Sequence, residues 1–364
     1  MKRIGIPRAL LYYQYFPMWR TFFETLGAQV VVSLPTNREV VATGQARLVA
    51  ETCLPVKIYA GHVCWLRDQG ADSIFIPAIR SVEDGAYNCG KFLGLPDLMK
   101  AVVEDCPPLL EIDLDVPKGQ RELYKAIYGL GRHFTANPLK IKKAAEAAWQ
   151  AHLGYQARLR TGLTPLEVLE DTADMFHVPR SQFQVGGTRN VRPGTLAGTA
   201  DFGLRTSSLT VAVVGHPYCV YDTFMNHDLL AKLRQMGVRV VTYEMAPEEG
   251  IEEGIRRLAG TKYWTYEGEV VGAAGYYFQE PQVDGVISVA VFACGPDSTM
   301  LEVVRHAAKK EGQRYMSLII DEHTAEAGLV TRLEAFVDML ARCKRRASPP
   351  PGLASCQGGI CPAN

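Results

Sequence analysis

The sequence alternates short β-branched runs with segments of helical spacing, and this alternation constrains the fold more than any other feature. The strand-like runs of the first half are residues 2–6, 29–34, 73–77 and 109–116, with helical patterns at 18–26 and 56–69. Those of the second half are 209–214, 238–243, 284–292 and 315–320, with a closing helical pattern at 333–343. Apolar strands that alternate with helices form parallel sheets covered on both faces. The sequence therefore predicts an α/β protein with two parallel-sheet domains.

The region between the two series has a different composition. Up to about residue 176 it is rich in Ala, Leu, Lys, Arg and Glu at helical spacing, and residues 181–208 are rich in Gly, Thr and Arg without a clear period. We expect four parts, which are an N-terminal α/β domain at 1–117, a helical segment with a connector or lid at 118–208, a C-terminal α/β domain at 209–345 and a flexible tail at 346–364.

Length and charge exclude some classes of protein. With 364 residues, 47% of them apolar, the chain is too long for a single ordinary core. Its formal net charge is zero, which disfavours a nucleic-acid binder because such a protein needs a basic excess. No apolar run approaches the roughly 18 to 20 residues of a membrane span. We therefore expect a cytoplasmic protein that binds neither nucleic acid nor membrane.

Three of the nine cysteines lie at turns that lead into helices, where parallel-sheet proteins bind ligands. They are Cys53 in ETCLPVK, Cys89 in NCGKF and Cys294 in ACGPDS. A cytoplasmic chain keeps thiols reduced, so clustered cysteines are candidates for metal ligands. Gly295 and the helix start beside Cys294 expose N–H groups that stabilise cluster sulfur and thiolate charge. The alternative is that each cysteine is a small buried hydrophobe.

Three other cysteines remain ambiguous. Cys219 follows the first strand of the second series in GHPYCVY, and we consider it an additional ligand candidate. Cys356 and Cys361 lie in the Pro- and Gly-rich tail, where their spacing is compatible either with ligation or with two incidental thiols.

Several polar residues near strand ends are ambiguous as well. His62, His216, Glu322 and His323 are either part of a site or satisfied polar residues at strand ends. The Asp-Glu-His run at 321–323 fits acid–base chemistry and a capped helix start equally well. The chain has no Walker-type phosphate loop, no GxGxxG after the first strand and no GxSxG elbow.

Seven segments together carry a family resemblance. They are IGIPRALLYYQYF, ETCLPVKIYAGHV, NCGKFLGLPD, GHPYCVYD, TYEGEVVGAA, FACGPDS and IDEHTAEAGLVTRLEAFVDML. Over residues 3–340 the chain resembles the activase-related proteins that accompany, or are fused to, the ATP-dependent activators of 2-hydroxyacyl-CoA dehydratases. That family is similar to the cluster-bearing subunits of these dehydratases and to the double-cubane cluster proteins.

The resemblance implies flavodoxin- or Rossmann-like domains with an iron–sulfur cluster at their interface. The ligands it implies are Cys53, Cys89 and Cys294, which would hold a 4Fe-4S cluster with one open iron, or a double-cubane 8Fe-9S cluster. Cys219 departs from the family motif, in which Asn is expected, and Ala78 stands where some relatives have a further cysteine. The implied partners are an ATP-dependent activator and a sister cluster subunit, in a homo- or hetero-oligomer.

Three functions compete at this point. The first is an anaerobic electron-transfer protein, reduced by an ATP-dependent activator, that relays electrons or reduces a small substrate. The second is a 2-hydroxyacyl-CoA dehydratase-like lyase, and the third is a non-catalytic cluster carrier or scaffold.

Overall fold

The computed structural model describes residues 1–175 and 209–347. The predicted connector at 181–208 and the tail cysteines Cys356 and Cys361 lie outside the described residues. Among the helices of the described part, none is long and apolar enough to cross a membrane.

The described strands form two four-stranded sheets in which all neighbouring strands are parallel. The first sheet contains β1 (Arg3–Ile6), β2 (Gln29–Val32), β3 (Ser73–Ser81) and β4 (Leu109–Asp115). The second contains β5 (Thr210–Gly215), β6 (Arg239–Thr242), β7 (Gly285–Val291) and β8 (Tyr315–Ile320). Their orders, β2-β1-β3-β4 and β6-β5-β7-β8, are equivalent. The predicted α/β class and all eight predicted strands are confirmed.

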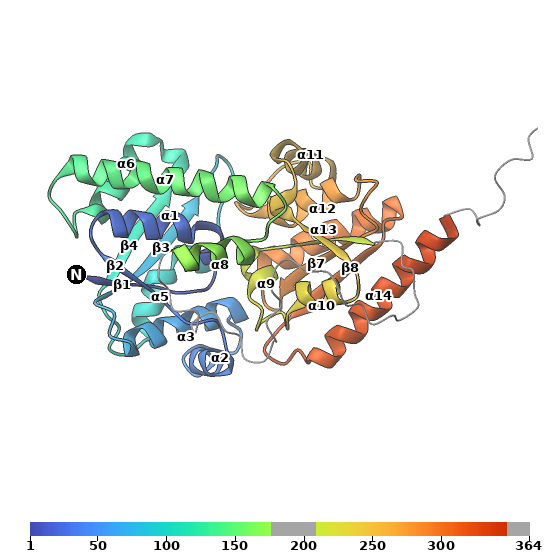
Figure 1. The fold of residues 1–364 in the computed structure, drawn as a ribbon, viewed down its shortest axis with the longest axis horizontal. Coiled ribbons are helices and arrows are strands. Elements are labelled where there is room, and N and C mark those ends of the chain that lie inside the picture. The colour runs from blue at the N-terminus through green and yellow to red at the C-terminus, as the bar shows by residue number, and fades with distance from the viewer. Residues whose placement is uncertain (176–208, 348–364) are drawn as a thin grey trace, which may run out of the picture.

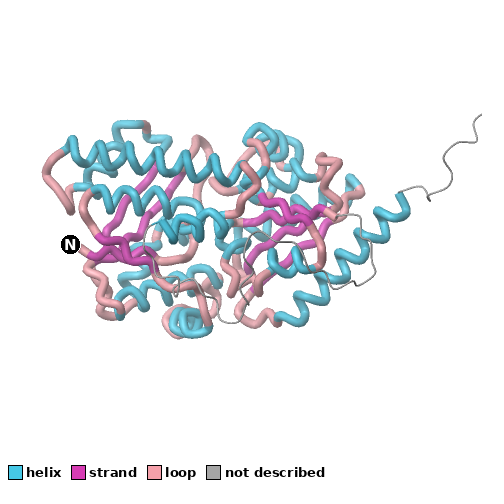
Figure 2. The backbone as a smooth tube through the Cα atoms, viewed as in Figure 1, coloured by secondary structure: helices cyan, strands magenta, loops and turns pink. Residues whose placement is uncertain are grey.

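Helices cover both faces of each sheet, and the two sheets lie side by side in two lobes (Figures 1 and 2). The helices of the first part are α1 (Tyr12–Thr25), α2 (Arg38–Gln45), α3 (Leu54–Asp68), α4 (Gly90–Leu93), α5 (Leu95–Val102), η1 (Val116–Lys118), α6 (Gln120–Gly131), α7 (Pro138–Arg160) and α8 (Pro165–Met175). Those of the second are α9 (Pro217–Tyr221), α10 (Leu229–Gln235), η3 (Tyr243–Met245), α11 (Glu248–Leu258), η4 (Glu267–Glu269), α12 (Val271–Tyr277), α13 (Gly295–Glu311) and α14 (Glu326–Ala347). We call the two halves the N-lobe and the C-lobe.

Helix α1 begins at Tyr12, six residues before the predicted start at Met18, and contains Pro17. A proline within a helix has no N–H to donate to the carbonyl four residues earlier. Here that carbonyl belongs to Tyr13, and it accepts a hydrogen bond of 2.6 Å from the Tyr155 hydroxyl of α7. The contact with α7 therefore supplies the hydrogen bond that Pro17 removes, and the helix continues through the proline.

Glycines allow two pairs of helices to approach closely. In the N-lobe, a Cβ on Gly44 of α2 would lie 1.8 Å from the carbonyl oxygen of Lys57, and one on Gly61 of α3 would lie 2.0 Å from that of Val40. In the C-lobe, a Cβ on Gly254 of α11 would lie 2.1 Å from the carbonyl oxygen of Gly272 in α12. The backbones are thus in direct contact, which only glycine permits at these positions.

One continuous cluster of buried apolar side chains extends through both lobes. It includes Phe23 and Phe75 of the N-lobe, and Val213 and Leu333 of the C-lobe. A second cluster covers the other face of the C-lobe sheet under α12 and α13. The lobes therefore share one core and are packed against each other.

Candidate functional site

A pocket lies where the carboxyl ends of the two sheets meet. It is lined by residues that follow strands β1, β3, β5 and β7, which are Leu10, Cys89, His216 and Cys294. The strand order reverses direction between β1 and β3 in the first sheet and between β5 and β7 in the second. Such switch points are where open parallel sheets bind ligands. The pocket encloses about 40 Å³, or about 530 Å³ with the space open to solvent.

Cys53, Cys89 and Cys294 all line this pocket, and each immediately precedes a helix. Cys53 stands at the N-cap of α3, Cys89 at that of α4 and Cys294 at that of α13. All three are partly buried and free of disulfides. The N-lobe thus contributes two thiols and the C-lobe one. The N-terminal ends of the longer helices α3 and α13 favour negative charge on the adjoining sulfur.

Burial disfavours the ionised, thiolate form of two of these cysteines. Desolvation raises the pKa of Cys53; the backbone N–H of Val56 partly offsets this rise, and negative charge on Cys89 adds to it. Desolvation also raises the pKa of Cys294, and the carboxylate of Asp297 and the nearby Cys53 raise it further. Neighbouring thiols that oppose each other's ionisation become thiolates most readily when a metal neutralises their charge.

A buried ion pair lies beside the thiols. The Nδ1 atom of His216 is 2.6 Å from Oε2 of Glu269, and its Nε2 atom is 3.0 Å from Oδ1 of Asp297. Burial disfavours the imidazolium, but the two carboxylates outweigh that effect and raise the pKa of His216 to about 10. His216 is therefore a cation at neutral pH. It also stacks on Tyr218, with ring centroids 5.2 Å apart.

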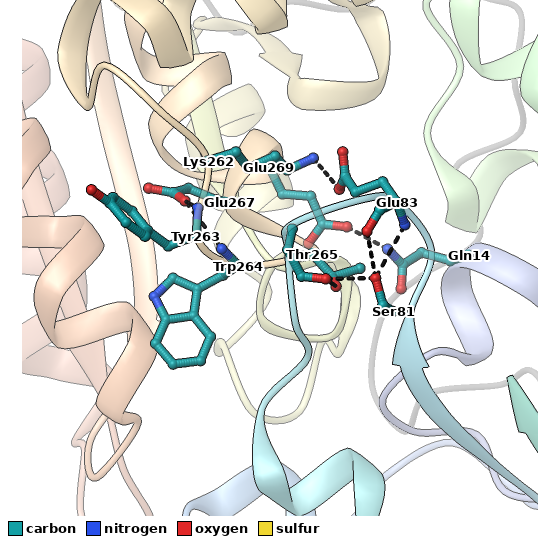
Figure 3. A network of polar contacts seen from close by, with 10 residues as sticks. Gln14, Ser81, Glu83, Lys262, Tyr263, Trp264, Thr265, Glu267 and Glu269 are labelled. Atoms are coloured by element: carbon teal, nitrogen blue, oxygen red, sulfur yellow. Dashed lines mark hydrogen bonds and ion pairs between the residues drawn. The ribbon is translucent and has the colours of Figure 1, made fainter. Parts of the chain in front are cut away.

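Two loops hold the lobes together next to the pocket (Figure 3). Gln14 of α1 donates a hydrogen bond from Nε2 to Glu269, and Lys262 forms an ion pair with Glu83. The main chains also pair, because Thr265 N donates to Tyr87 O over 3.1 Å. Contacts from both lobes therefore fix the segment that carries Glu269 behind the pocket.

Two residues near the pocket adopt left-handed backbone conformations that side chains other than glycine rarely take. Ala293, directly before Cys294, has a φ of 64°, and Leu10 has a φ of 50°. Such a conformation costs of order 1 kcal/mol or more, so the surrounding packing must impose it. Next to this turn, a Cβ placed on Gly295 would meet no atom within 4 Å, which leaves open space beside Cys294.

Of the remaining candidate residues in the described part of the chain, the structure places only His216 in the lining of the pocket. His216 lines the pocket, whereas Cys219 is fully buried in the shared core and does not line it. His62 is buried and lies 3.1 Å from the Thr36 hydroxyl, which donates to Asp222 over 2.5 Å. His323 is exposed.

Glu322 is outside the pocket and pairs with Lys57 of α3 at 2.7 Å. Lys57 lies in the first turns of the helix that begins after Cys53, so Glu322 acts on the pocket only through the position of α3. This is a structural contact between the lobes.

Sequence reasoning missed the partners of His216. Asp297 was visible in principle, because it follows Cys294 by three residues in the first turn of a helix. Glu269 has no local signal, since its contact with His216 joins segments 53 residues apart. The aromatic lining from Phe92, Tyr218 and Tyr266 was not anticipated either.

The described donors do not form a site for a single ion. In the described part of the chain, no three His, Cys, Asp or Glu side chains converge on one ion position. Iron–sulfur clusters are instead held by several cysteine thiolates spread around a larger core. A cluster is larger than the enclosed space, so exposed lining side chains such as Tyr87 and Lys91 would have to turn outward.

Comparison with protein families gives a single clear result. Residues 3–246 match the family described as CoA enzyme activase uncharacterised domain (DUF2229). Since the match covers more than half of the chain, the protein belongs to this family, which links it to CoA-enzyme activase systems. A search of the curated proteins found no match.

Proposed function

We propose that this protein is an iron–sulfur redox protein that holds a 4Fe-4S cluster between its lobes through Cys53, Cys89 and Cys294. The observation that carries the proposal is the convergence of three thiols from three separate segments on one pocket. Membership of a family linked to CoA-enzyme activases supports an ATP-dependent activator as the electron donor. When bound, such a cluster would accept and release single electrons at a potential set by its ligands and surroundings.

The chain's own residues have three tasks in this proposal. The three thiols hold the group and leave one iron without a cysteine ligand. Phe92, Tyr218 and Tyr266 shield the site from water on one side, and lower solvent exposure tunes the potential of such sites. Lys91 lies at the exposed edge, where a partner or small substrate would approach.

The number of thiols at the pocket favours a single cubane over a double-cubane cluster. A larger cluster needs more thiolates, but Cys219 is enclosed in the core and Ala78 supplies no sulfur. The open iron position then leaves two uses for the electron, relay to another protein or reduction of a small substrate.

The direct test is the iron and acid-labile sulfide content after anaerobic purification or reconstitution. We expect about four irons per chain in the wild type, and a clear loss in Cys53→Ser, Cys89→Ser and Cys294→Ser because each removes one ligand. Reduction of the loaded protein by an ATP-dependent activator should then bleach its visible absorbance.

Two cysteines outside the pocket serve as matched controls. Cys106→Ser and Cys343→Ser should retain the wild-type iron content, because neither residue lines the pocket. Wild-type iron content in all three pocket variants, or no iron in the reconstituted wild type, would refute the proposal. Loaded protein that no activator reduces would instead favour a passive cluster carrier.

A further inference from the structure

A second cavity lies at the seam between the lobes. It is bounded by the start of α1, by α7, and by η3 with α11, and it encloses about 370 Å³. This volume is within the range of small-molecule sites. Gln14 lines the cavity and donates to Glu269, which in turn contacts His216 of the cysteine pocket. We call it the seam cavity.

Tyrosines contributed by both lobes line the seam cavity. They are Tyr13, Tyr15, Tyr155 and Tyr243. Aromatic rings attract cations through the negative charge of their faces, and they do so most strongly where water is excluded. Such a lining suits an organic cation better than an anion.

The charges of the seam cavity are also predominantly negative. Its two cations are already paired, because Lys262 contacts Glu83 (Figure 3) and Arg160 lies 3.8 Å from Glu248. Two further lining acids, Glu244 and Glu252, have no basic partner within the described residues. Burial raises the pKa of Glu244 to about 7, so this group is only partly ionised at neutral pH, and a bound cation would favour its ionised form. An anionic ligand would meet uncompensated negative charge here, whereas a cation would supply the missing partner.

Three lining residues present hydrogen-bond acceptors without a partner. In the part of the chain that the structure describes, Gln14 Oε1, His152 Nδ1 and Glu244 Oε1 are buried and accept no hydrogen bond. The amide of Gln14 is oriented by its bond to Glu269, because a carboxylate accepts and must face the NH₂ group.

His152 can also accept a hydrogen bond at Nδ1, in the tautomer that carries its proton on Nε2. It is only 5% exposed, and burial lowers its pKa, so the ring is neutral and one nitrogen can accept. Leaving buried acceptors unpaired is unfavourable, and a ligand with several N–H donors removes that penalty.

We propose that the seam cavity binds a small organic cation with several N–H donors, an amine or a guanidinium compound. The tyrosines would surround its charge, Glu244 and Glu252 would neutralise it, and Gln14 and His152 would accept its N–H groups. The assignment is independent of the cluster, since no cysteine lines this cavity.

Calorimetric titration of the full chain with defined probes tests the proposal. We expect agmatine or putrescine to bind saturably, and glycerol and acetyl-CoA not to bind at this site. The same result is expected with Cys53→Ser, so that failure of the cluster proposal does not affect the outcome. Absence of binding by both cations, or acetyl-CoA that displaces agmatine from the protein, would overturn the assignment.

Charge-neutralising variants locate the bound cation. Glu244→Gln should weaken binding at least about tenfold, because a buried hydrogen bond to a charged group is lost. Glu252→Gln at the exposed mouth is the second variant in case the first does not fold. Glu253→Gln is the matched control, since Glu253 is next to Glu252 on α11 but pairs with Arg256 outside the cavity. Unchanged affinity in both Glu244→Gln and Glu252→Gln would contradict the proposal.

Discussion

At the scale of single residues, His216 is held by charged partners on both of its ring nitrogens. It is 5% exposed and lies between two buried carboxylates, so removing it leaves Glu269 and Asp297 without their cation. Breaking a buried ion pair in this way is usually far more costly than replacing the whole pair by apolar residues. The identity of this residue thus matters for stability as well as for the pocket.

We predict that His216→Gln lowers the free energy of unfolding at pH 7 by about 3–5 kcal/mol. The pKa of His216 rises from an ordinary 6.5 to about 10 on folding. A raised pKa means that its contribution is complete below pH 6.5 and disappears as the pH rises through 10. The difference between wild type and variant should therefore shrink over that interval, as measured by urea unfolding. Parallel pH profiles would contradict the assignment of His216 as a buried cation.

At the scale of elements, the contact between α2 and α3 positions one of the candidate ligands. Cys53 directly precedes α3, and α3 reaches its place only because Gly44 and Gly61 let the two backbones touch. Any side chain at Gly61 must push α2 and α3 apart. The start of α3, and Cys53 with it, would move accordingly.

We predict that Gly61→Ala destabilises the protein by roughly 1–3 kcal/mol or more and lowers its iron content on reconstitution. Gly129→Ala in α6 is the control, because its Cβ would meet no atom within 4 Å and alanine favours the helix. Thermal unfolding and iron analysis of the two variants should separate them. Equal stability of both would show that the helices can separate without cost.

Much of the fold was predictable because its signals are local. A buried parallel strand such as β5 is a continuous apolar run, and the sequence shows it without any knowledge of its neighbours. The start of α1 was not predictable in the same way. Pro17 normally ends a helix, and the compensating hydroxyl comes from Tyr155, more than a hundred residues away.

The candidate site was predictable only in part, for the same reason. Cys53, Cys89 and Cys294 were found because Gly, Pro and helix starts mark their turns. The rule for parallel sheets accounts for Cys89 and Cys294, which follow β3 and β7, whereas Cys53 follows helix α2 and reaches the pocket through the packing of α3. Their role as cluster ligands stays a prediction. Glu269 contacts His216 only through tertiary packing, and the seam cavity is formed by residues of α1, α7, η3 and α11, so neither has a sequence signature.

At the scale of the whole molecule, the two lobes are joined through a shared apolar core and through buried polar contacts. Lys57 of the N-lobe is 2% exposed and pairs with Glu322 of the C-lobe, while Thr36 donates to Asp222 across the same seam. Contacts of this kind couple the stability of one lobe to that of the other.

We predict that Lys57→Met accelerates amide hydrogen exchange in β1 and β3 and also in β5 and β7. The expected loss is about 1–3 kcal/mol, because Glu322 and the Ala50 carbonyl both lose their donor. Arg305→Met, which removes an exposed pair within α13, should change exchange very little. Faster exchange confined to the N-lobe would indicate that the lobes unfold independently.

The division of the three pocket thiols, two on the N-lobe and one on the C-lobe, has a mechanical consequence. A group bound to all three would act as a cross-link between residues far apart in the chain, and cross-links that close long loops restrict the unfolded state most. Loading and emptying the pocket would then tighten and loosen the joint between the halves. The distance between the lobes would report whether the thiols are occupied.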